Sequence, residues 1–446
     1  MNTNFIKHTL LILTLLVGSQ IRAKESESKK DKISFDYNFS GATPLTVETI
    51  SDFSYRIKPV TKISGSQFFY LSFRINNFRK DEVLHLELAW PPVATAANFP
   101  AGTSPEVIQR QTLFGNFASV VPDILYYSYD KKNWSHIPDK GVLGENGVIK
   151  FSLKGNGKPL YFATQVPFTY ERYQALLKYV TKKEPTAVKN IGNTQRGEPM
   201  YALVFGSKKK EAKTIFIQSL QHGNEFTGPL VANAMIHYLL DNKDGKKLRE
   251  KYAFQFIPVF DIDYLHYTLN PSLGTKDNRE SAQIKRTDNP NRDWVKKTWV
   301  EVNNVDRFID ENLKIGTKYL IGFDLHNGWG NKEDSGGSYL AFPKNSAPDE
   351  YIAKQFEFND YMIKNTDHIM YREPLSVGVE GLFFRYFYEK TGALSILIEF
   401  SRFEWWNREK KAYAPTNQDS QDIYAIQAIQ ARTQFEDYYN TRKNNH

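Results

Sequence analysis

Hydrophobic and polar positions follow two different patterns along the chain, and the change lies at about residue 168. Before it, short segments alternate apolar and polar positions, and turn formers such as Asn76-Asn77 and Gly144-Glu145-Asn146-Gly147 separate them. This pattern predicts an antiparallel β-sandwich over residues 32–167, with few long helices. The expected strands are Ile33–Phe39, Phe68–Ile75, Val83–Leu88, Ile124–Tyr129, Val148–Leu153 and Leu160–Thr164.

After Thr169, strand-like and helix-like segments alternate. Nearly continuous apolar strands such as Ile215-Phe216-Ile217 suit a sheet covered on both faces, which favours an α/β domain over residues 168–446. The expected strands are Tyr201–Phe205, Thr214–Ser219, Ala253–Phe260, Tyr319–Asp324 and Leu394–Phe400. The expected helices are Tyr170–Tyr179, Pro229–Leu240, Tyr351–Asn365, Gly381–Glu389 and Asp422–Asn440.

The first 23 residues have the pattern of an export signal. Lys7 and His8 precede an apolar run from Thr9 to Val17, and Ala23 supplies a small residue at the expected cleavage site. The run is too short to cross a bilayer of about 30 Å, so we expect no membrane span in the mature chain. An uncleaved anchor or a buried helix is the alternative. Residues 24–31 are predicted to be a charged linker, and the protein to be exported to a periplasm or the medium.

Composition narrows the class of protein. With 41% hydrophobic and 14% aromatic residues, the chain has enough apolar surface to fold into compact domains. It has no cysteine, so neither disulfides nor a lipid-modified N-terminus are expected. The net charge of +8 comes from dispersed cations rather than a basic patch, which argues against nucleic-acid binding.

A histidine and a glutamate lie three residues apart where the predicted strand Thr214–Ser219 ends. His222 and Glu225 precede the helix expected from Pro229, and the end of a buried strand is where α/β sheets bind ligands. In a first helical turn this spacing lets both side chains converge on one zinc ion. A capping glutamate beside a surface histidine has the same local pattern, so other residues must decide.

Two further strands carry polar residues at their ends. The strand Tyr319–Asp324 leads into His326, which is expected at the same edge of the sheet, with Asp324 as a candidate to orient its ring. Glu399 is the single carboxylate in the apolar segment Ser395–Phe400. Because an unpaired buried carboxylate costs several kcal/mol, it needs a cation, a water held by the metal or a raised pKa. A general base beside a catalytic zinc ion meets that need.

Asn291 and Arg292 form an adjacent amide and guanidinium pair. Together they can hold a planar carboxylate through charge-assisted hydrogen bonds. The same dipeptide alone is typical of an ordinary surface loop.

In chain order the four segments carry His222 with Glu225, Asn291-Arg292, His326 and Glu399, and this order resembles that of the zinc metallocarboxypeptidases of the M14 family. The resemblance covers residues 168–435 and implies a mixed, eight-stranded-type sheet flanked by helices, here preceded by the β-sandwich. It implies one Zn²⁺ ion bound by His222, Glu225 and His326.

The resemblance also implies roles around the metal. Asn291 and Arg292 would bind the free C-terminal carboxylate of a peptide substrate, and Glu399 would act as base and then as acid. An upstream arginine would stabilise the oxyanion. Arg286 is the favoured candidate because it lies shortly before the Asn-Arg pair, and Arg279 is the alternative.

Two positions depart from the family pattern. Asn224 stands between the first two ligands, where pancreatic-type members have arginine. The tyrosine usually found before the catalytic glutamate has no counterpart in Ser376–Glu380; Tyr371 and Tyr386 are the candidate replacements, and the absence of any replacement is the alternative.

Arg385 lies at the place where the family tunes its side-chain pocket, 14 positions before Glu399. A buried arginine there favours an acidic C-terminal residue such as glutamate, or a diaminopimelate-like carboxylate in cell-wall peptides. An exposed helix arginine is the alternative.

The β-rich half is similar to the N-terminal domain of the cytosolic carboxypeptidase, or deglutamylase, branch. The similar segments are Phe68–Asn77, Tyr126–Tyr129 with Trp134, and Tyr161–Tyr170. An export signal conflicts with a cytosolic role, so tubulin-type substrates are not implied.

The sequence therefore predicts a zinc exopeptidase that removes C-terminal amino acids from peptides. Two alternatives stay open. One is an amidase or deacylase acting on peptidoglycan stem peptides or acylated amino acids, and the other is a non-catalytic zinc-binding protein on the same scaffold.

Overall fold

The fold was examined in a computed structural model, which describes most of residues 32–415. The described ranges are 32–59, 70–89, 125–137, 142–143, 148–223, 225–270, 289–327, 338–341, 348–366, 371–374, 381–400, 404–407 and 412–415. The predicted export signal, the linker and the predicted helix Asp422–Asn440 lie outside them. Within these ranges, no helix has the length and apolar character needed to cross a membrane.

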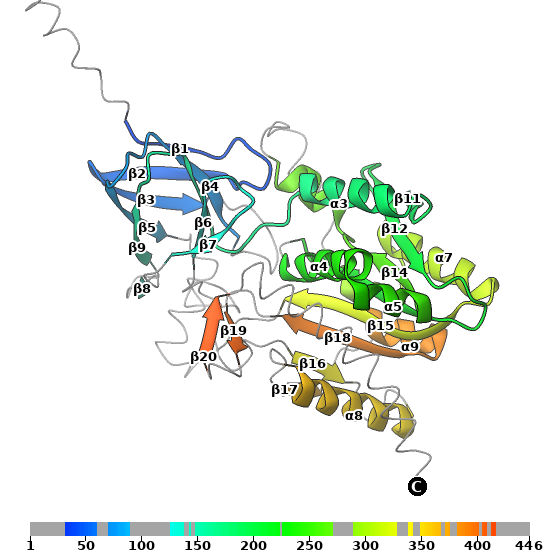
Figure 1. Cartoon of the computed structure of the whole chain (residues 1–446). Coiled ribbons are helices and arrows are strands. Elements are labelled where there is room, and N and C mark those ends of the chain that lie inside the picture. The colour runs from blue at the N-terminus through cyan, green and yellow to red at the C-terminus, as the bar shows by residue number, and fades with distance from the viewer. Residues whose placement is uncertain are drawn as a thin grey trace, which may run out of the picture.

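Residues 32–163 form two five-stranded sheets, shown in blue to cyan in Figure 1. One sheet has the order β1 (Ser34–Asp36), β4 (Ser72–Asn76), β10 (Leu160–Ala163), β6 (Tyr126–Ser128), β7 (Ser135–His136). The other has the order β2 (Leu45–Ser51), β3 (Ser54–Pro59), β5 (Val83–Ala89), β9 (Val148–Lys154), β8 (Val142–Leu143). Alternate residues of β5 and β9 are buried, as their period-two pattern predicts.

All six predicted strands of this half are present, and the structure adds two features that the sequence analysis did not predict. The β3–β5 pair is parallel, because β4 intervenes in the chain and lies in the other sheet. The hairpin of β2 and β3 was not predicted. β2 lies at the sheet edge and buries only Leu45 among its seven residues, so it lacks an apolar face that would indicate a strand.

The second half contains a mixed eight-stranded sheet, as the family resemblance implies. Its order is β11 (Val188–Asn193), β12 (Pro199–Gly206), β14 (Ala253–Ile257), β13 (Lys213–Ser219), β15 (Lys318–Asn327), β18 (Leu394–Phe400), β16 (Ser338–Ala341), β17 (Tyr371–Pro374). The four central strands run parallel to one another. They are almost wholly buried, which explains their continuous apolar sequences. A small hairpin, β19 (Glu404–Asn407) with β20 (Ala412–Pro415), follows.

Helices cover both faces of this sheet (Figure 1). One apolar core joins the sheet to α3 (Tyr170–Lys183), α4 (Thr227–Asp241), α5 (Lys243–Lys251) and α8 (Asp349–Asn365). The opposite face packs on α7 (Val300–Lys314) and α9 (Phe383–Thr391). This second core continues into the two five-stranded sheets within residues 32–163, which form the β-domain. α5 was not predicted because it buries only Gly245, whereas the spacing of Val302, Val305 and Ile309 is a signal that would have predicted α7.

Candidate metal centre

The segment that carries the first two ligand candidates begins with an unusual backbone angle. Leu220 directly follows β13, is fully buried and has φ +61°. This left-handed conformation costs an L-residue about 1–2 kcal/mol. Its carbonyl accepts a hydrogen bond from Asp261 N (3.0 Å), and the flanking Ser219 carbonyl accepts one from Phe260 N (3.0 Å). These two hydrogen bonds from Phe260 and Asp261 therefore fix the direction in which the chain leaves β13.

His222 and Glu225 lie in a turn rather than in a helix. The helix α4 begins only at Thr227, and Glu225 N donates to the carbonyl of His222 (3.1 Å). The expectation that the pair occupies the first helical turn is wrong. The turn still brings the side chains together, with His222 Nδ1 2.9 Å from Glu225 Oε1. We call residues 221–226 the metal loop.

His326 completes a compact triad with this pair. Its Nδ1 lies 2.8 Å from Glu225 Oε2, so the carboxylate faces one imidazole with each oxygen. One ligand atom from each of the three residues lies within 4.8 Å of the others. Two imidazole nitrogens and one carboxylate are the donors of a catalytic zinc site that keeps a position open. The three predicted ligands thus fit a zinc ion.

The electrostatics of the triad suit a metal ligand set. Burial acts to raise the pKa of Glu225, but the charges and hydrogen bonds of His222 and His326 outweigh it and hold that pKa well below its usual value. Glu225 is therefore a carboxylate anion, the form that binds metal.

The far nitrogen of each imidazole already has an oxygen partner. His222 Nε2 donates to Asn289 Oδ1 (2.9 Å), and His326 Nε2 lies 3.0 Å from Asp324 Oδ2. With Nε2 occupied by a proton, each ring presents Nδ1 toward Glu225. This is how outer partners fix the tautomer and orientation of metal-binding histidines. The predicted contact between Asp324 and His326 is thus present, whereas Asn289 was not predicted.

Gln221 is a second residue that the sequence analysis missed. Its Nε2 lies 2.8 Å from both carboxylate oxygens of Asp324, and its Oε1 accepts from Trp294 Nε1 (2.9 Å). Gln218 donates to the same carboxylate (3.1 Å). Gln221 therefore connects the metal loop, the partner of His326 and the loop that carries Arg292. Its place between the end of an apolar strand and His222 was the available signal, because a buried amide needs several partners.

Glu399 lies beside the triad. On the parallel strands β15 and β18, His326 and Glu399 are register partners, which places their side chains on the same face of the sheet. Glu399 is half-buried rather than fully buried. Arg292 is near: desolvation lowers the pKa of its guanidinium, and the charge of Glu399 acts in the opposite direction. The structure therefore brings Glu399, Arg292 and the triad together.

Asn291 is more enclosed than its predicted role requires. Its side chain is buried, its Oδ1 accepts from Phe383 N (2.9 Å), and its Nδ2 lies 3.2 Å from His326 Nε2. Arg292, by contrast, is exposed in the short helical turn η5 (Pro290–Arg292). Arg292 is thus open to solvent, whereas Asn291 is enclosed beside His326.

Arg385 and Tyr386 lie on α9 with partners of their own. Arg385 Nε donates to Glu389 (2.8 Å) in an i, i+4 ion pair at the surface. The Tyr386 hydroxyl donates to Asp306, which makes it a structural residue of the α7–α9 contact. The predicted residues Arg286, its alternative Arg279 and Asn224 lie outside the described residues, as does the side chain of Tyr371.

Asp306 gives a pH-dependent prediction. Burial acts to raise its pKa, but hydrogen bonds from Lys297, Lys390 and Tyr386 lower it from 3.8 to about 2. Because the pKa of Asp306 is lower in the folded than in the unfolded state, its ionised form stabilises the fold at pH values above the unfolded-state pKa. This contribution to the free energy of unfolding is lost as pH falls from about 4 toward 2. Asp306→Asn should cost about 2 kcal/mol at pH 7. The urea midpoints of Asp306→Asn and wild type should approach each other below pH 4. A difference that stays constant with pH would contradict the lowered pKa of Asp306.

Comparison with known proteins agrees with this geometry. Residues 173–316 match the zinc carboxypeptidase family, peptidase family M14. The matched span includes His222, Glu225, Asn291 and Arg292. This segment is similar to the M14 zinc carboxypeptidases, and the similarity supports a zinc carboxypeptidase hydrolase.

Solved metallocarboxypeptidases share the fold of both halves of this chain. The enzyme from Burkholderia cenocepacia superposes with a TM-score of 0.68 at 17% identity, covering 92% of this chain and 100% of the other. The enzyme from Pseudomonas aeruginosa, in complex with (2-guanidinoethylmercapto)succinic acid, gives 0.66 at 14% identity, covering 90% and 97%. No curated sequence matches the chain. The likeness of the β-domain to the deglutamylase branch stays a prediction.

Proposed function

We propose that this M14 enzyme removes single residues from peptide C-termini, with Arg292 binding the terminal carboxylate and Glu399 moving the proton. The register of His326 with Glu399 carries this proposal, because it sets a carboxylate beside a zinc ligand at the same strand ends. The electrostatic coupling of Arg292 to Glu399 adds a cation at the same place. A guanidinium grips a carboxylate with two parallel hydrogen bonds.

The residues divide the reaction between them. When bound, zinc supplies Lewis-acid polarisation of the scissile carbonyl and lowers the pKa of water. Glu399 accepts the proton of the attacking water at its carboxylate and returns it to the leaving amine. Arg292 fixes the terminal carboxylate, so the last peptide bond is the one presented. Arg286 is proposed to stabilise the oxyanion. Water and peptide give a free amino acid and a peptide shortened by one residue, without a covalent enzyme intermediate.

A preference for acidic C-terminal residues is the finer part of the proposal, and it rests on Arg385. The Nε of Arg385 donates to Glu389, so the two terminal NH₂ groups of the Arg385 guanidinium would bind the acidic side chain of the substrate. Arg385→Ala should then lower kcat/KM for C-terminal glutamate about 10-fold and leave C-terminal leucine unchanged. Equal effects on both peptides would mean that Arg385 has no role in the preference for acidic C-terminal residues.

A peptide panel tests the reaction class. It should contain one sequence with different last residues, each free or amidated at the C-terminus, together with N-acyl amino acids and a stem peptide ending in diaminopimelate. Cleavage of free but not amidated peptides supports the exopeptidase. Preference for N-acyl amino acids or the stem peptide favours the amidase or deacylase, and zinc binding with no turnover on the whole panel favours the non-catalytic alternative.

The compound bound to the Pseudomonas aeruginosa enzyme is a useful second probe. It carries two carboxylates and a guanidino group. An acid-preferring pocket should bind it more weakly than benzylsuccinic acid, which offers the same dicarboxylate without a cation.

Export is also proposed, from the charged and apolar pattern of residues 1–23. N-terminal sequencing of the mature protein should start near Lys24. A protein that keeps Met1 in the cytoplasm would contradict export.

A further inference from the structure

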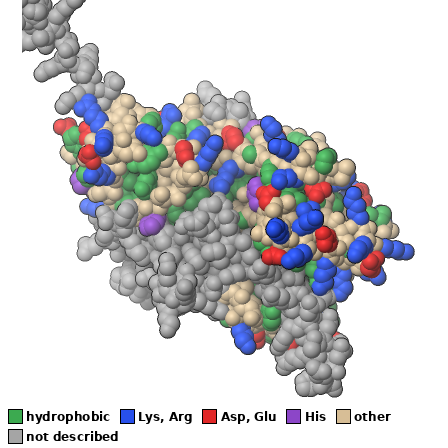
Figure 2. Space-filling model, viewed as in Figure 1, with side chains coloured by type: hydrophobic (Ala, Val, Ile, Leu, Met, Phe, Trp, Pro, Cys, Tyr) green, Lys and Arg blue, Asp and Glu red, His purple; other side chains and the backbone are tan. Residues whose placement is uncertain are grey.

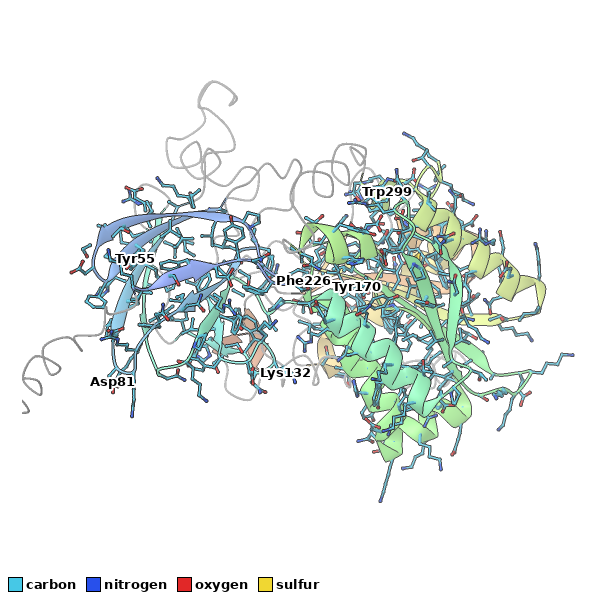
Figure 3. All side chains as sticks on the ribbon, turned by 90° about the horizontal axis from the view of Figure 1, so that it is seen from above. Tyr55, Asp81, Lys132, Tyr170, Phe226 and Trp299 are labelled. Atoms are coloured by element: carbon cyan, nitrogen blue, oxygen red, sulfur yellow. The ribbon has the colours of Figure 1, made fainter. Side chains whose placement is uncertain are left out.

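The β-domain touches the metal loop directly. Tyr70 precedes β4 in the β-domain and is almost completely buried. Its ring meets Phe226 edge to face, with centroids 4.8 Å apart and planes at 89°. Phe226 directly follows the ligand Glu225. Figure 3 places Phe226 where the two halves of the molecule meet. The last residue of the metal loop therefore packs against a side chain from the other domain.

A second connection reaches the opposite side of the metal loop. The Tyr70 hydroxyl donates to the carbonyl of Gly41, and Gly41 N donates to the carbonyl of Leu269 (2.6 Å). Leu269 ends the π-helix η3. The first residue of η3, Tyr264, lies with its ring against Gly223, where an added Cβ would be only 2.0 Å from a ring atom.

The metal loop is thus enclosed between two supports that both lead to Tyr70. One is the ring contact with Phe226, and the other runs through Gly41 and Leu269 to η3 and so to Gly223. π-helical turns are frequent at functional sites, which agrees with η3 acting as a support for a ligand segment. In the view of Figure 2, described atoms of the two halves adjoin one another.

We propose that Tyr70 is a positioning residue through which the β-domain sets the geometry of the metal loop. It touches neither substrate nor metal and acts through Phe226 and Gly41. The β-domain then contributes to zinc affinity and turnover, not only to stability. Outer-shell residues of metal sites typically change metal affinity 10- to 100-fold, and a residue one step further out should act at the lower end of that range.

The test compares Tyr70→Leu with Tyr55→Leu. Tyr55 is a matched control because it is also a buried tyrosine of the β-domain, with its ring on Phe35 and its hydroxyl donating to Asp52. It is labelled in Figure 3 within the β-domain, away from Phe226. Both variants should lose thermal stability. Only Tyr70→Leu should weaken zinc binding about 10-fold in chelator competition, alter the Co²⁺ absorption spectrum, and speed hydrogen exchange of residues 219–231 in the metal-free protein.

Two further variants keep the test decisive if Tyr70→Leu does not fold. Tyr70→Phe retains the ring but not the bond to Gly41, and Phe226→Leu removes the ring partner. We expect both to weaken zinc binding and to leave the exchange of β9 unchanged. Wild-type zinc affinity, Co²⁺ spectrum and loop exchange in folded Tyr70 and Phe226 variants would overturn the proposal. Because none of these measurements needs a substrate, they stand apart from the test of the proposed reaction.

Discussion

The Glu399→Gln variant should bind zinc with normal stoichiometry and lose at least about 10²-fold in kcat. Proton transfer by a positioned carboxylate contributes about 10²–10⁴-fold, and glutamine cannot accept the proton of the attacking water. The amide keeps the volume of the side chain beside His326, so the ligand triad should not change. Because Glu399 is half-buried and near Arg292, its charge is also part of the local field that Arg292 experiences.

Zinc content by atomic absorption and kcat on the best peptide of the panel measure this effect. Glu250→Gln is the control, since it makes the same change on an exposed glutamate of α5. That variant should retain full activity. A Glu399→Gln protein with more than about one tenth of wild-type kcat would remove Glu399 from the mechanism.

The parts of the fold that the sequence predicted are those where burial decides the pattern. β13, β15 and β18 are buried on both faces, so their continuous apolar residues allowed their positions in the chain to be predicted closely. Edge elements do not have this signal. β2 exposes all but its first residue, and α5 has no apolar stripe, so both were missed.

The candidate site was predictable only as far as strand ends specify it. His326 and Glu399 follow from the rule that ligands lie at the carboxyl ends of parallel strands, and their exact register could come only from the folded sheet. The left-handed Leu220 and the turn before α4 are set by tertiary hydrogen bonds from Phe260 and Asp261. No local sequence pattern records such a bond.

Long-range partners were the least predictable feature. Gln221 and Trp294 are 73 positions apart, and Tyr70 belongs to a different domain from Phe226. A single sequence shows that such residues are polar or aromatic, and the packing of the whole chain decides which of them meet. Tyr386 illustrates the reverse case: it was a candidate for the site, and its hydroxyl is instead bound to Asp306.

The His326→Ala variant should lose its zinc. Removing one of three ligands leaves His222 and Glu225, so the loss of affinity should exceed the roughly 100-fold that outer-shell changes produce. Turnover should fall with metal content. Stability should fall as well, because the fully buried Asp324 loses its imidazole partner and retains the amides of Gln218 and Gln221.

His237→Ala is the matched control for this change. His237 lies on α4, is 43% exposed and faces Asp241, so its removal should leave zinc stoichiometry and kcat at wild-type values. Zinc retained after dialysis against a weak chelator, measured for both variants and wild type, separates the two positions. Full occupancy in folded His326→Ala protein would mean that the metal is held elsewhere. Loss of zinc from His326→Ala, with His237→Ala unchanged, would tie the metal to the compact triad, because His326 shares the Glu225 carboxylate with His222.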